Sequence, residues 1–275
     1  MVGSANRLRL LPRYISLLAV AAVMLFPLLW MARVALLPTG QSISTMASWL
    51  AGVTLGNFAD LLTGGMLLRP LFNSVLVGGI VTLGNVAFCF VTAYALARYK
   101  NLGNKMLFGT IILVLMIPAH IIIIPLYIIC LETGIFDSYW ALILPWLVNP
   151  IGIFLVKQYI ESLPTSMEEA ARIDGASELR VLVQVVMPMC RPALAVLAIQ
   201  VFFTNWNSFL FPFILTSSQD LRTLPVALAM YQGHQAVDWQ HLMAGSTLAV
   251  IPVLAVFLFF QRQIVSGITA GAIKQ

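Results

Sequence analysis

The stretch LFNSVLVGGIVTLGNVAFCFVTAYALA, residues 71–97, contains no Asp, Glu, Lys or Arg. It is longer than the about 20 predominantly apolar residues that an α-helix needs to cross a bilayer. The composition agrees, because 60% of the 275 residues are hydrophobic and 9% are charged, against about 25% charged residues in ordinary soluble domains. So few charges cannot cover a water-exposed surface, and the sequence therefore predicts a membrane protein.

Five further apolar runs lie on either side of this stretch. Only the first contains a charged residue, Arg33, which is close enough to the end of the run to reach the interface. Arginines and an Ala-Val-Ala sequence give that run some likeness to a signal peptide, but it exceeds the about 7–15 residues of a signal core, which favours a retained span. We predict an all-α membrane protein with six transmembrane helices, at residues 14–36, 71–97, 106–131, 139–156, 193–215 and 242–260.

Basic residues are distributed unequally between alternate connections. All but three of the 15 Lys and Arg residues lie before the first span, after the second, between the fourth and fifth, or after the sixth. Because cytoplasmic loops carry an excess of Lys and Arg, we expect both termini and the connection 157–192 to be cytoplasmic. The expected organisation is an N-terminus at 1–13, a six-span domain at 14–260 and a tail at 261–275.

The connection 157–192 is much longer than the median of about 4–6 residues in compact proteins, and its pattern is helical. Thr165 and Ser166 are each followed three residues later by Glu, so either can begin a helix with a capping box. Glu168 and Arg172 have the i, i+4 spacing of a helical ion pair. A short helix is therefore expected in the first half of this connection.

Gly175 interrupts that helix, and a second helical pattern follows, which Pro188 and Pro192 are expected to end. Residues 168–180 carry more acids than bases, so an anionic lipid surface would repel them. We therefore interpret the segment as a docking element for a protein partner, in preference to an amphipathic hairpin on the membrane. The expected apolar stripe of the second helix consists of Leu179, Leu182 or Val183, and Val186.

The run EAARIDGA at 169–176, which continues to VVMP at 185–188, resembles the "EAA" loop of permeases in binding-protein-dependent ATP-binding-cassette importers. That loop reads E-A-A, three residues, G, nine residues, then I-x-L-P, and all its spacings hold here. Val185 and Met187 replace Ile and Leu and keep the apolar character. Outside the loop the first 70 residues match weakly, and the tail is similar to that of the second permease of maltose-type systems. Segments that resemble the carbohydrate branch are Asn73-Ser74, AYALAR at 93–98, Ile117-Pro118, IPLY at 124–127, WNSFL at 206–210 and the tail 261–271.

The resemblance implies a type I importer permease fold in a bacterial inner or plasma membrane. It implies that the chain forms, with a homologous second permease, an alternating-access pathway for a sugar, polyol or glycerol phosphate. It further implies an external solute-binding protein and two cytoplasmic ATPase subunits, which would hold ATP and Mg. Residues 168–182 would be the coupling helix, and the residues carried over for ATPase coupling are Glu168, Glu169, Ala170, Ala171, Asp174, Gly175, Ala176 and Pro188.

The chain has no G-x-x-x-x-G-K-[ST] phosphate loop, so we expect neither ATP binding, nor enzymatic activity, nor a cofactor in this chain. Its candidates for a substrate pathway are polar or aromatic residues inside the spans. Amides and an aromatic face suit a sugar, although hydrogen bonding between helices explains the amides equally well, and packing is the commoner role for the histidine. These candidates are Asn205, Trp206, Asn207, Gln200 and His120.

His234, Asp238 and His241 would share one face of a helix after the fifth span and are metal-ligand types. Chance placement in a wet segment is the better interpretation, and no metal site is expected. The three cysteines are widely spaced and form neither a disulfide framework nor a metal-binding pattern.

An ion-coupled secondary transporter is the alternative function. Such carriers keep ionisable side chains inside the membrane for their mechanism, whereas the five spans after the first contain no Asp, Glu, Lys or Arg. A membrane enzyme would require a nucleophile–base pair, which the sequence does not suggest. The net charge of +5 comes without a basic patch interleaved with aromatics, which argues against nucleic-acid binding.

Overall fold

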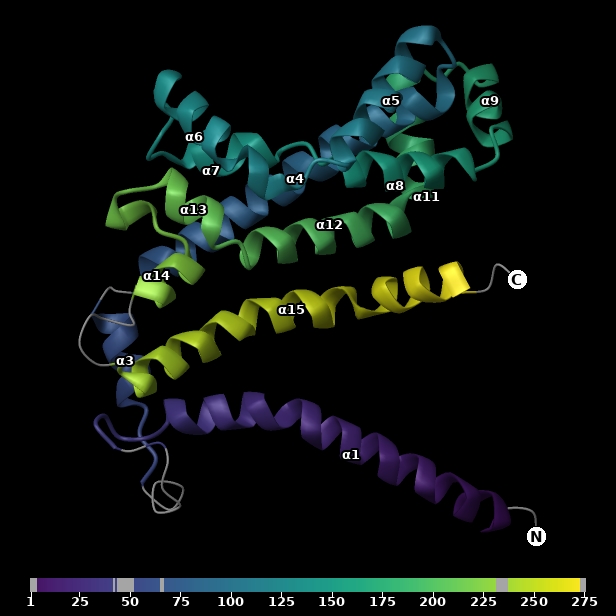
Figure 1. Ribbon diagram of the computed structural model, residues 1–275. Coiled ribbons are helices and arrows are strands. Elements are labelled where there is room, and N and C mark those ends of the chain that lie inside the picture. The colour runs from purple at the N-terminus through teal and green to yellow at the C-terminus, as the bar shows by residue number, and fades with distance from the viewer. Residues whose placement is uncertain (1–3, 42, 44–51, 65–66, 231–236, 273–275) are drawn as a thin grey trace. The chain divides into compact units, whose positions relative to one another are not determined.

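The computed structural model describes residues 4–41, 43, 52–64, 67–230 and 237–272. Within these ranges, side chains are described from residue 12 to residue 261. Within these ranges all regular secondary structure is helical (Figure 1). The chain divides into two compact units. The smaller comprises Met1–Leu68 and Ala227–Pro252, and the larger comprises Arg69–Val226 and Val253–Gln275.

Four helical stretches are long and apolar enough to cross a membrane, and two pairs of helices qualify if each pair is one bent span. The described residues therefore hold between four and six candidate spans, and each predicted apolar run overlaps one of them. The two pairs bend by 93° and 78°. The candidates are Pro12–Ala35, Leu68–Arg98, Tyr139–Glu161, Trp239–Gln261 and the pairs Leu102–Leu115 with Ala119–Glu132 and Glu178–Met189 with Arg191–Trp206.

The larger unit is organised around α4 (Leu68–Arg98), with α13 toward the beginning of this helix and α9 toward its end (Figure 1). Its other elements are α5 (Leu102–Leu115), η1 (Ala119–Ile122), α6 (Ile123–Glu132), α7 (Tyr139–Ile143), η2 (Leu144–Trp146), α8 (Pro150–Glu161), α9 (Ser166–Ile173), α10 (Glu178–Arg180), the π-helical η3 (Val181–Val186), α11 (Met187–Met189), α12 (Arg191–Trp206), α13 (Leu210–Leu215) and η4 (Gln219–Leu221); α14 (Leu224–Met230) begins in this unit.

Three of the predicted spans are interrupted. The fourth passes from α7 through η2 and the non-helical residues 147–149 before α8 begins. The third breaks next to Pro118, between α5 and η1, because proline lacks a backbone N–H and clashes with the preceding turn. The fifth, predicted at 193–215, is divided, since α12 ends at Trp206 and α13 begins at Leu210. The Asn207 side-chain amide donates to the Phe203 carbonyl at 2.8 Å, which occupies an acceptor of the last turn of α12.

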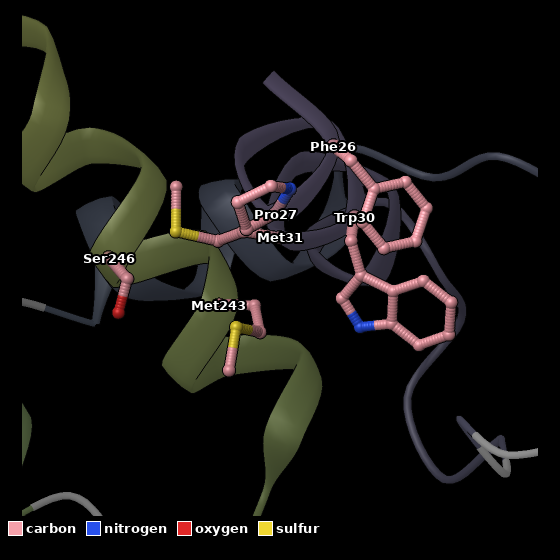
Figure 2. Close-up of a pocket in the computed structure, with 6 residues that line it drawn as sticks. All are labelled: Phe26, Pro27, Trp30, Met31, Met243 and Ser246. Carbon is pink, nitrogen blue, oxygen red and sulfur yellow. The ribbon is translucent and has the colours of Figure 1, made fainter. Parts of the chain in front are cut away.

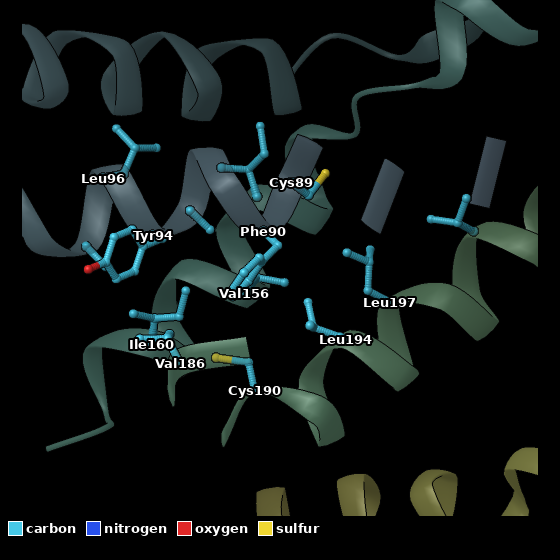
Figure 3. Close-up of a cluster of buried hydrophobic side chains, with 14 of the residues drawn as sticks. Cys89, Phe90, Tyr94, Leu96, Val156, Ile160, Val186, Cys190, Leu194 and Leu197 are labelled. Carbon is cyan, nitrogen blue, oxygen red and sulfur yellow. The ribbon is translucent and has the colours of Figure 1, made fainter. Parts of the chain in front are cut away.

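The core of the larger unit lies where α4, α8, η3 and α12 meet (Figure 3). Gly152 of α8 makes this close packing possible. A Cβ at that position would lie 2.7 Å from a methyl carbon of Leu197 in α12 and 3.1 Å from the Cys89 sulfur in α4. Small residues at helix contacts are the expected solution in lipid, where dispersion forces rather than the hydrophobic effect hold helices together. The buried side chains include Phe90, Val156, Ile160, Val186 and Leu197.

The smaller unit contains α1 (Ser4–Ala35), α3 (Gly56–Thr63) and the first part of α15 (Trp239–Ala272). Buried Asn57 holds the end of α1, because its amide donates to the Ala35 and Leu37 carbonyls at 2.7 and 2.8 Å. These acceptors belong to the carbonyls that a helix end leaves without intrahelical partners. Figure 2 shows an open, mainly apolar pocket of this unit, lined by Phe26, Pro27, Trp30, Met31, Met243 and Ser246.

Candidate functional site

The segment from α9 to α11 has the predicted order of a short helix, a glycine turn and a second helix. α9 ends in two backbone hydrogen bonds, from Ala176 N–H to the Ala171 carbonyl and from Gly175 N–H to the Arg172 carbonyl, both at 3.0 Å. This is the Schellman arrangement, in which the residue after the C-cap adopts a left-handed conformation. Gly175 has φ +82°, so the predicted glycine turn is confirmed.

The two small residues of this turn, Ala171 and Ala176, are half-buried and pack against the core of the larger unit. They occupy the C3 and C″ positions, which are frequently in hydrophobic contact in a Schellman motif. The alanine and glycine spacing of the EAARIDGA run therefore has a local structural reason. It closes α9 with a compact turn that fits against the membrane-spanning helices.

Glu168 is the most enclosed charged residue of the segment, with 2% of its surface exposed. Its carboxylate forms an ion pair with Arg98, at the end of α4, with an Nη2–Oε1 distance of 2.7 Å. Arg98 Nε donates to the same oxygen at 2.8 Å, and the Tyr94 hydroxyl donates to the second oxygen at 3.3 Å. Buried charges are tolerated only when they are paired in this way, so Glu168 anchors α9 to α4.

The predicted i, i+4 pair of Glu168 and Arg172 is confirmed, with 3.6 Å between Nη2 and Oε2. The predicted capping box, from Thr165 or Ser166, is wrong, because the N-cap is Thr165, whose side chain makes no capping hydrogen bond, and Ser166 is already the first residue of α9. Glu168 would have to turn back toward Thr165 to complete the box, and its carboxylate instead faces Arg98. Two guanidinium N–H groups and the Tyr94 hydroxyl offer this carboxylate more donors than the single backbone N–H of a capping box.

Arg172 extends this network across the turn. Its guanidinium donates to both Glu178 carboxylate oxygens, at 2.7 and 3.1 Å, and to the Tyr94 hydroxyl at 3.2 Å. These hydrogen bonds to Glu178 raise the pKa of Arg172 above its usual range. The Arg172 guanidinium therefore links α9 to Glu178, at the start of the second helix.

The buried positions of the second helix differ from the apolar stripe that was predicted for it. Residues 181–186 form a π-helix, in which hydrogen bonds join residues five apart. Val181 and Val186, five residues apart, are both buried, whereas Leu179 is 70% exposed. The helix ends at Met189, between Pro188 and Pro192 as expected, and the chain bends by 78° before α12 begins at Arg191.

The outward face of the segment combines acids with large apolar side chains. Glu169, Ala170, Asp174 and Gly175 are exposed, and Pro188 is half-buried. Ile173 is 86% exposed and Met167 is 54% exposed. Neither apolar residue was singled out from the sequence; the available signal was a large apolar side chain on a short charged helix.

The pathway candidates occupy two places in the larger unit. Trp206 is 3% exposed, and its ring stacks on Phe202 at 5.5 Å between centroids. Asn205 and Gln200 are half-buried on α12, and Asn207 is exposed just beyond it. His120 lies on η1, exposed, with its ring 5.9 Å from that of Phe211 in α13.

The candidate metal face is occupied by internal contacts where it is described. His234 lies outside the described residues. His241 contacts Asp238 at 2.7 Å and Asp60 of α3 at 3.4 Å. No group of three or more His, Cys, Asp and Glu residues is placed to hold a metal ion in the part of the chain that the structure covers.

With this geometry in place, comparison with known proteins is informative. The profile of the family described as "Binding-protein-dependent transport system inner membrane component" matches residues 85–270. The chain belongs to this family. The match covers α9, its glycine turn and the helices that hold them.

Curated relatives extend over nearly the whole chain. The arabinooligosaccharides transport system permease protein AraQ of Halalkalibacterium halodurans is 32% identical over 259 residues, covering 93% of this chain and 93% of the relative. The trehalose transport system permease protein SugB of Mycobacterium tuberculosis is 32% identical over 254 residues, covering 91% and 92%. These relatives are transport permeases, and ATP hydrolysis in such systems belongs to partner subunits.

The fold is shared with a chain of a bacterial ABC transporter involved in the import of the acidic polysaccharide alginate, known from a crystal structure. The TM-score is 0.80 at 20% identity, over 95% of this chain and 98% of that chain. The permease family and its fold are thereby established for this protein.

Proposed function

We propose that the chain is a transmembrane permease subunit of an ATP-driven importer for a sugar or a related polyol or glycerol phosphate. The observation that carries this proposal is the α9 segment, which is anchored to a long apolar helix by Glu168 and exposes an acidic and apolar face. Family membership and the permeases named for arabinooligosaccharide and trehalose transport support the sugar class.

The proposed topology has six spans in a bacterial inner membrane, with both termini and the α9 segment in the cytoplasm. The excess of Lys and Arg on that side supports this orientation. Each bent pair then counts as one span, and its break lies against protein or a wet cavity, where freed backbone groups can be satisfied.

In the proposed coupling mechanism, the exposed face of α9 docks on an ATPase subunit that carries ATP and Mg. Ile173 and Met167 would supply the apolar contact, with Glu169 and Asp174 at its rim. An apolar centre with a polar rim is the usual anatomy of a protein interface. Glu168 faces the other way, so its role within the proposed coupling surface is to hold α9 in place.

The remaining proposed partners are a homologous second permease and an external solute-binding protein. A second solved alginate transporter, with a TM-score of 0.64 at 16% identity, is in complex with a periplasmic protein bound to an alginate pentasaccharide. We place the solute pathway beside α12 and η1, where Gln200, Asn205, Asn207 and His120 offer polar groups. Trp206 supports that region by packing on Phe202.

The test is uptake into proteoliposomes that contain this chain with its second permease and its ATPase subunits, with the binding protein added outside. Radiolabelled arabinooligosaccharides, trehalose and maltose form the first panel. We expect accumulation of one class of sugar that depends on ATP inside the vesicles and persists with an ionophore. Uptake that survives without ATP and collapses with the ionophore would assign the chain to the ion-coupled carriers instead.

A further inference from the structure

α4 is the long helix whose interior contains no proline. Its one proline, Pro70, lies in the first turn, whereas α1 contains Pro12 and Pro27 and α15 contains Pro252. Prolines are the commonest cause of sharp kinks, because each removes a backbone hydrogen bond. With 31 residues and a rise of 1.5 Å per residue, α4 is about 46 Å long and runs as one unbroken helix through Gly78 and Gly79.

At its end, α4 is held to α9 by a buried ion pair. Arg98 and Glu168 have side-chain exposures of 12% and 3%, and Tyr94, one turn earlier, donates to the second carboxylate oxygen. Separating these elements would break the Arg98 ion pair and the Tyr94 hydrogen bond of a buried carboxylate, which is unfavourable. Any displacement of α9 is therefore passed to the end of α4.

At its beginning, α4 is fastened to the chain that follows α13. Asn73 is fully buried, and its amide donates to the Asp220 and Arg222 carbonyls at 2.7 and 2.9 Å. The Tyr139 hydroxyl donates to the Asn73 side-chain oxygen at 2.7 Å. All three of these hydrogen bonds go to other elements, so Asn73 joins the first turns of α4 to the segment 220–222 and to α7.

A second contact lies directly beside the first. The Leu224 backbone N–H donates to the Ser74 hydroxyl at 2.8 Å, in a buried position. Arg69 Nε also donates to the Asp220 carbonyl, at 3.3 Å. The segment 220–224 is therefore attached to α4 at consecutive positions rather than through a single bond.

We propose that α4 is a mechanical link between α9 and the segment 220–224, with Glu168 and Asn73 as the positioning residues at its two ends. From Asn73 to Arg98 the helix covers about 37 Å. Because buried hydrogen bonds and an ion pair hold both ends of α4, movement imposed on α9 is passed along the helix to the segment 220–224. This inference rests on the proposed function, in which an ATPase moves α9.

The competing interpretation is that each network only stabilises its own end of the fold. The two interpretations differ in how mutations combine. Substitutions farther apart than about 7–10 Å normally have additive free-energy effects, so independent networks predict that fold-changes multiply. If the two networks instead act in series along one path, the double variant should be no worse than the more damaging single variant.

The experiment measures how much the sugar-loaded binding protein stimulates ATP hydrolysis by the reconstituted transporter. The variants are Glu168→Gln, which keeps the shape and removes the charge, Asn73→Ala, and the double variant. Thr82→Val is the matched control, because the Thr82 hydroxyl bonds only to the Gly78 carbonyl of α4 itself. Membrane amount and co-purification with the ATPase subunits are recorded for every variant.

We expect each single variant to reduce stimulation by about five-fold or more, the lower end of typical coupling between sites, while stimulation of the Thr82→Val control remains unchanged. The double variant should equal the more damaging single variant. Multiplied effects in the double variant, or full stimulation in either single variant, would overturn the proposal. A wild-type transporter without ATP-dependent uptake would instead refute the proposed function.

If a variant does not assemble, or if both single variants abolish stimulation, a milder pair takes its place. Arg98→Lys keeps the charge and loses the guanidinium fork, and Tyr139→Phe removes only the hydroxyl that bonds to Asn73. The same comparison of singles and double applies, with the same two outcomes.

Discussion

The turn after α9 provides a graded test at Gly175. Its φ of +82° lies in a region that residues with a Cβ rarely adopt. A Cβ added there would meet no atom within 4 Å. The cost of a substitution therefore comes from the backbone conformation and not from overlap with the rest of the protein.

The magnitude follows from this conformational cost. An L-residue in the left-handed region costs about 1–2 kcal/mol, Asn is the mildest exception, and β-branched residues are the worst fit. We expect a small loss for Gly175→Asn, about 1 kcal/mol for Gly175→Ala, and about 2 kcal/mol for Gly175→Val. A change of 1–2 kcal/mol shifts an equilibrium by about 5–30-fold, so the valine variant should open the turn in a substantial share of molecules.

The assay is sugar uptake and stimulated ATP hydrolysis in proteoliposomes, with membrane insertion as the control. Activity should fall in the order Gly, Asn, Ala, Val while insertion stays normal, because the turn lies outside the candidate spans. Equal activity across the series would refute the role given to the turn. An asparagine variant worse than alanine would show that something other than backbone conformation limits this position.

Four further predictions follow from particular contacts. Arg98→Met leaves the buried carboxylate of α9 without its ion-pair partner and should cost about 3 kcal/mol, seen as a lower Tm of the purified chain; an unchanged Tm would contradict the anchoring role. Ile173→Asp changes a side chain that is 86% exposed, so the Tm should stay within the range of about 0.5 kcal/mol typical of surface changes while co-purification of the ATPase is lost; retained co-purification would remove Ile173 from the interface. Gly152→Val places its Cβ 2.7 Å from a leucine methyl of α12, and overpacking of about 1–3 kcal/mol should lower the Tm, whereas an equal Tm would mean that α8 and α12 separate freely. Hydrogen bonds led by the Ser218 backbone N–H lower the pKa of Asp137 below its ordinary 3.8. The stabilisation that these bonds give is present above pH 3.8 and is lost as the pH falls through the lowered pKa. Hydrogen-exchange protection at 217–218 should show this acid step in the wild type and not in Asp137→Asn.

Much of the fold follows from local sequence properties. The apolar runs overlap the candidate spans because the length and composition of each run meet the requirement of the bilayer by themselves. The turn at Gly175 was also expected, since it depends on the backbone of one residue. The EAARIDGA run at 169–176 located the candidate site because its spacing resembles that of a known permease loop.

The misplaced details depend on side-chain hydrogen bonds and on packing that hydrophobic periodicity does not report. The interruption between α12 and α13 and the π-helix at 181–186 both occur inside apolar stretches. Periodicity describes such stretches as regular helix, because side-chain hydrogen bonds and packing against other helices do not appear in it. The buried positions of the second helix therefore came five apart rather than three or four apart.

The adjacent acids Glu168 and Glu169 show what the sequence determines and what depends on the tertiary structure. The sequence alone determined that both lie in the first turn of a short helix before a glycine turn, since capping, spacing and composition act over a few residues. Only the tertiary structure decided that Glu168 turns inward and Glu169 outward. The reason is the guanidinium of Arg98, 70 residues earlier in the chain, which compensates one buried carboxylate and leaves the other to solvent.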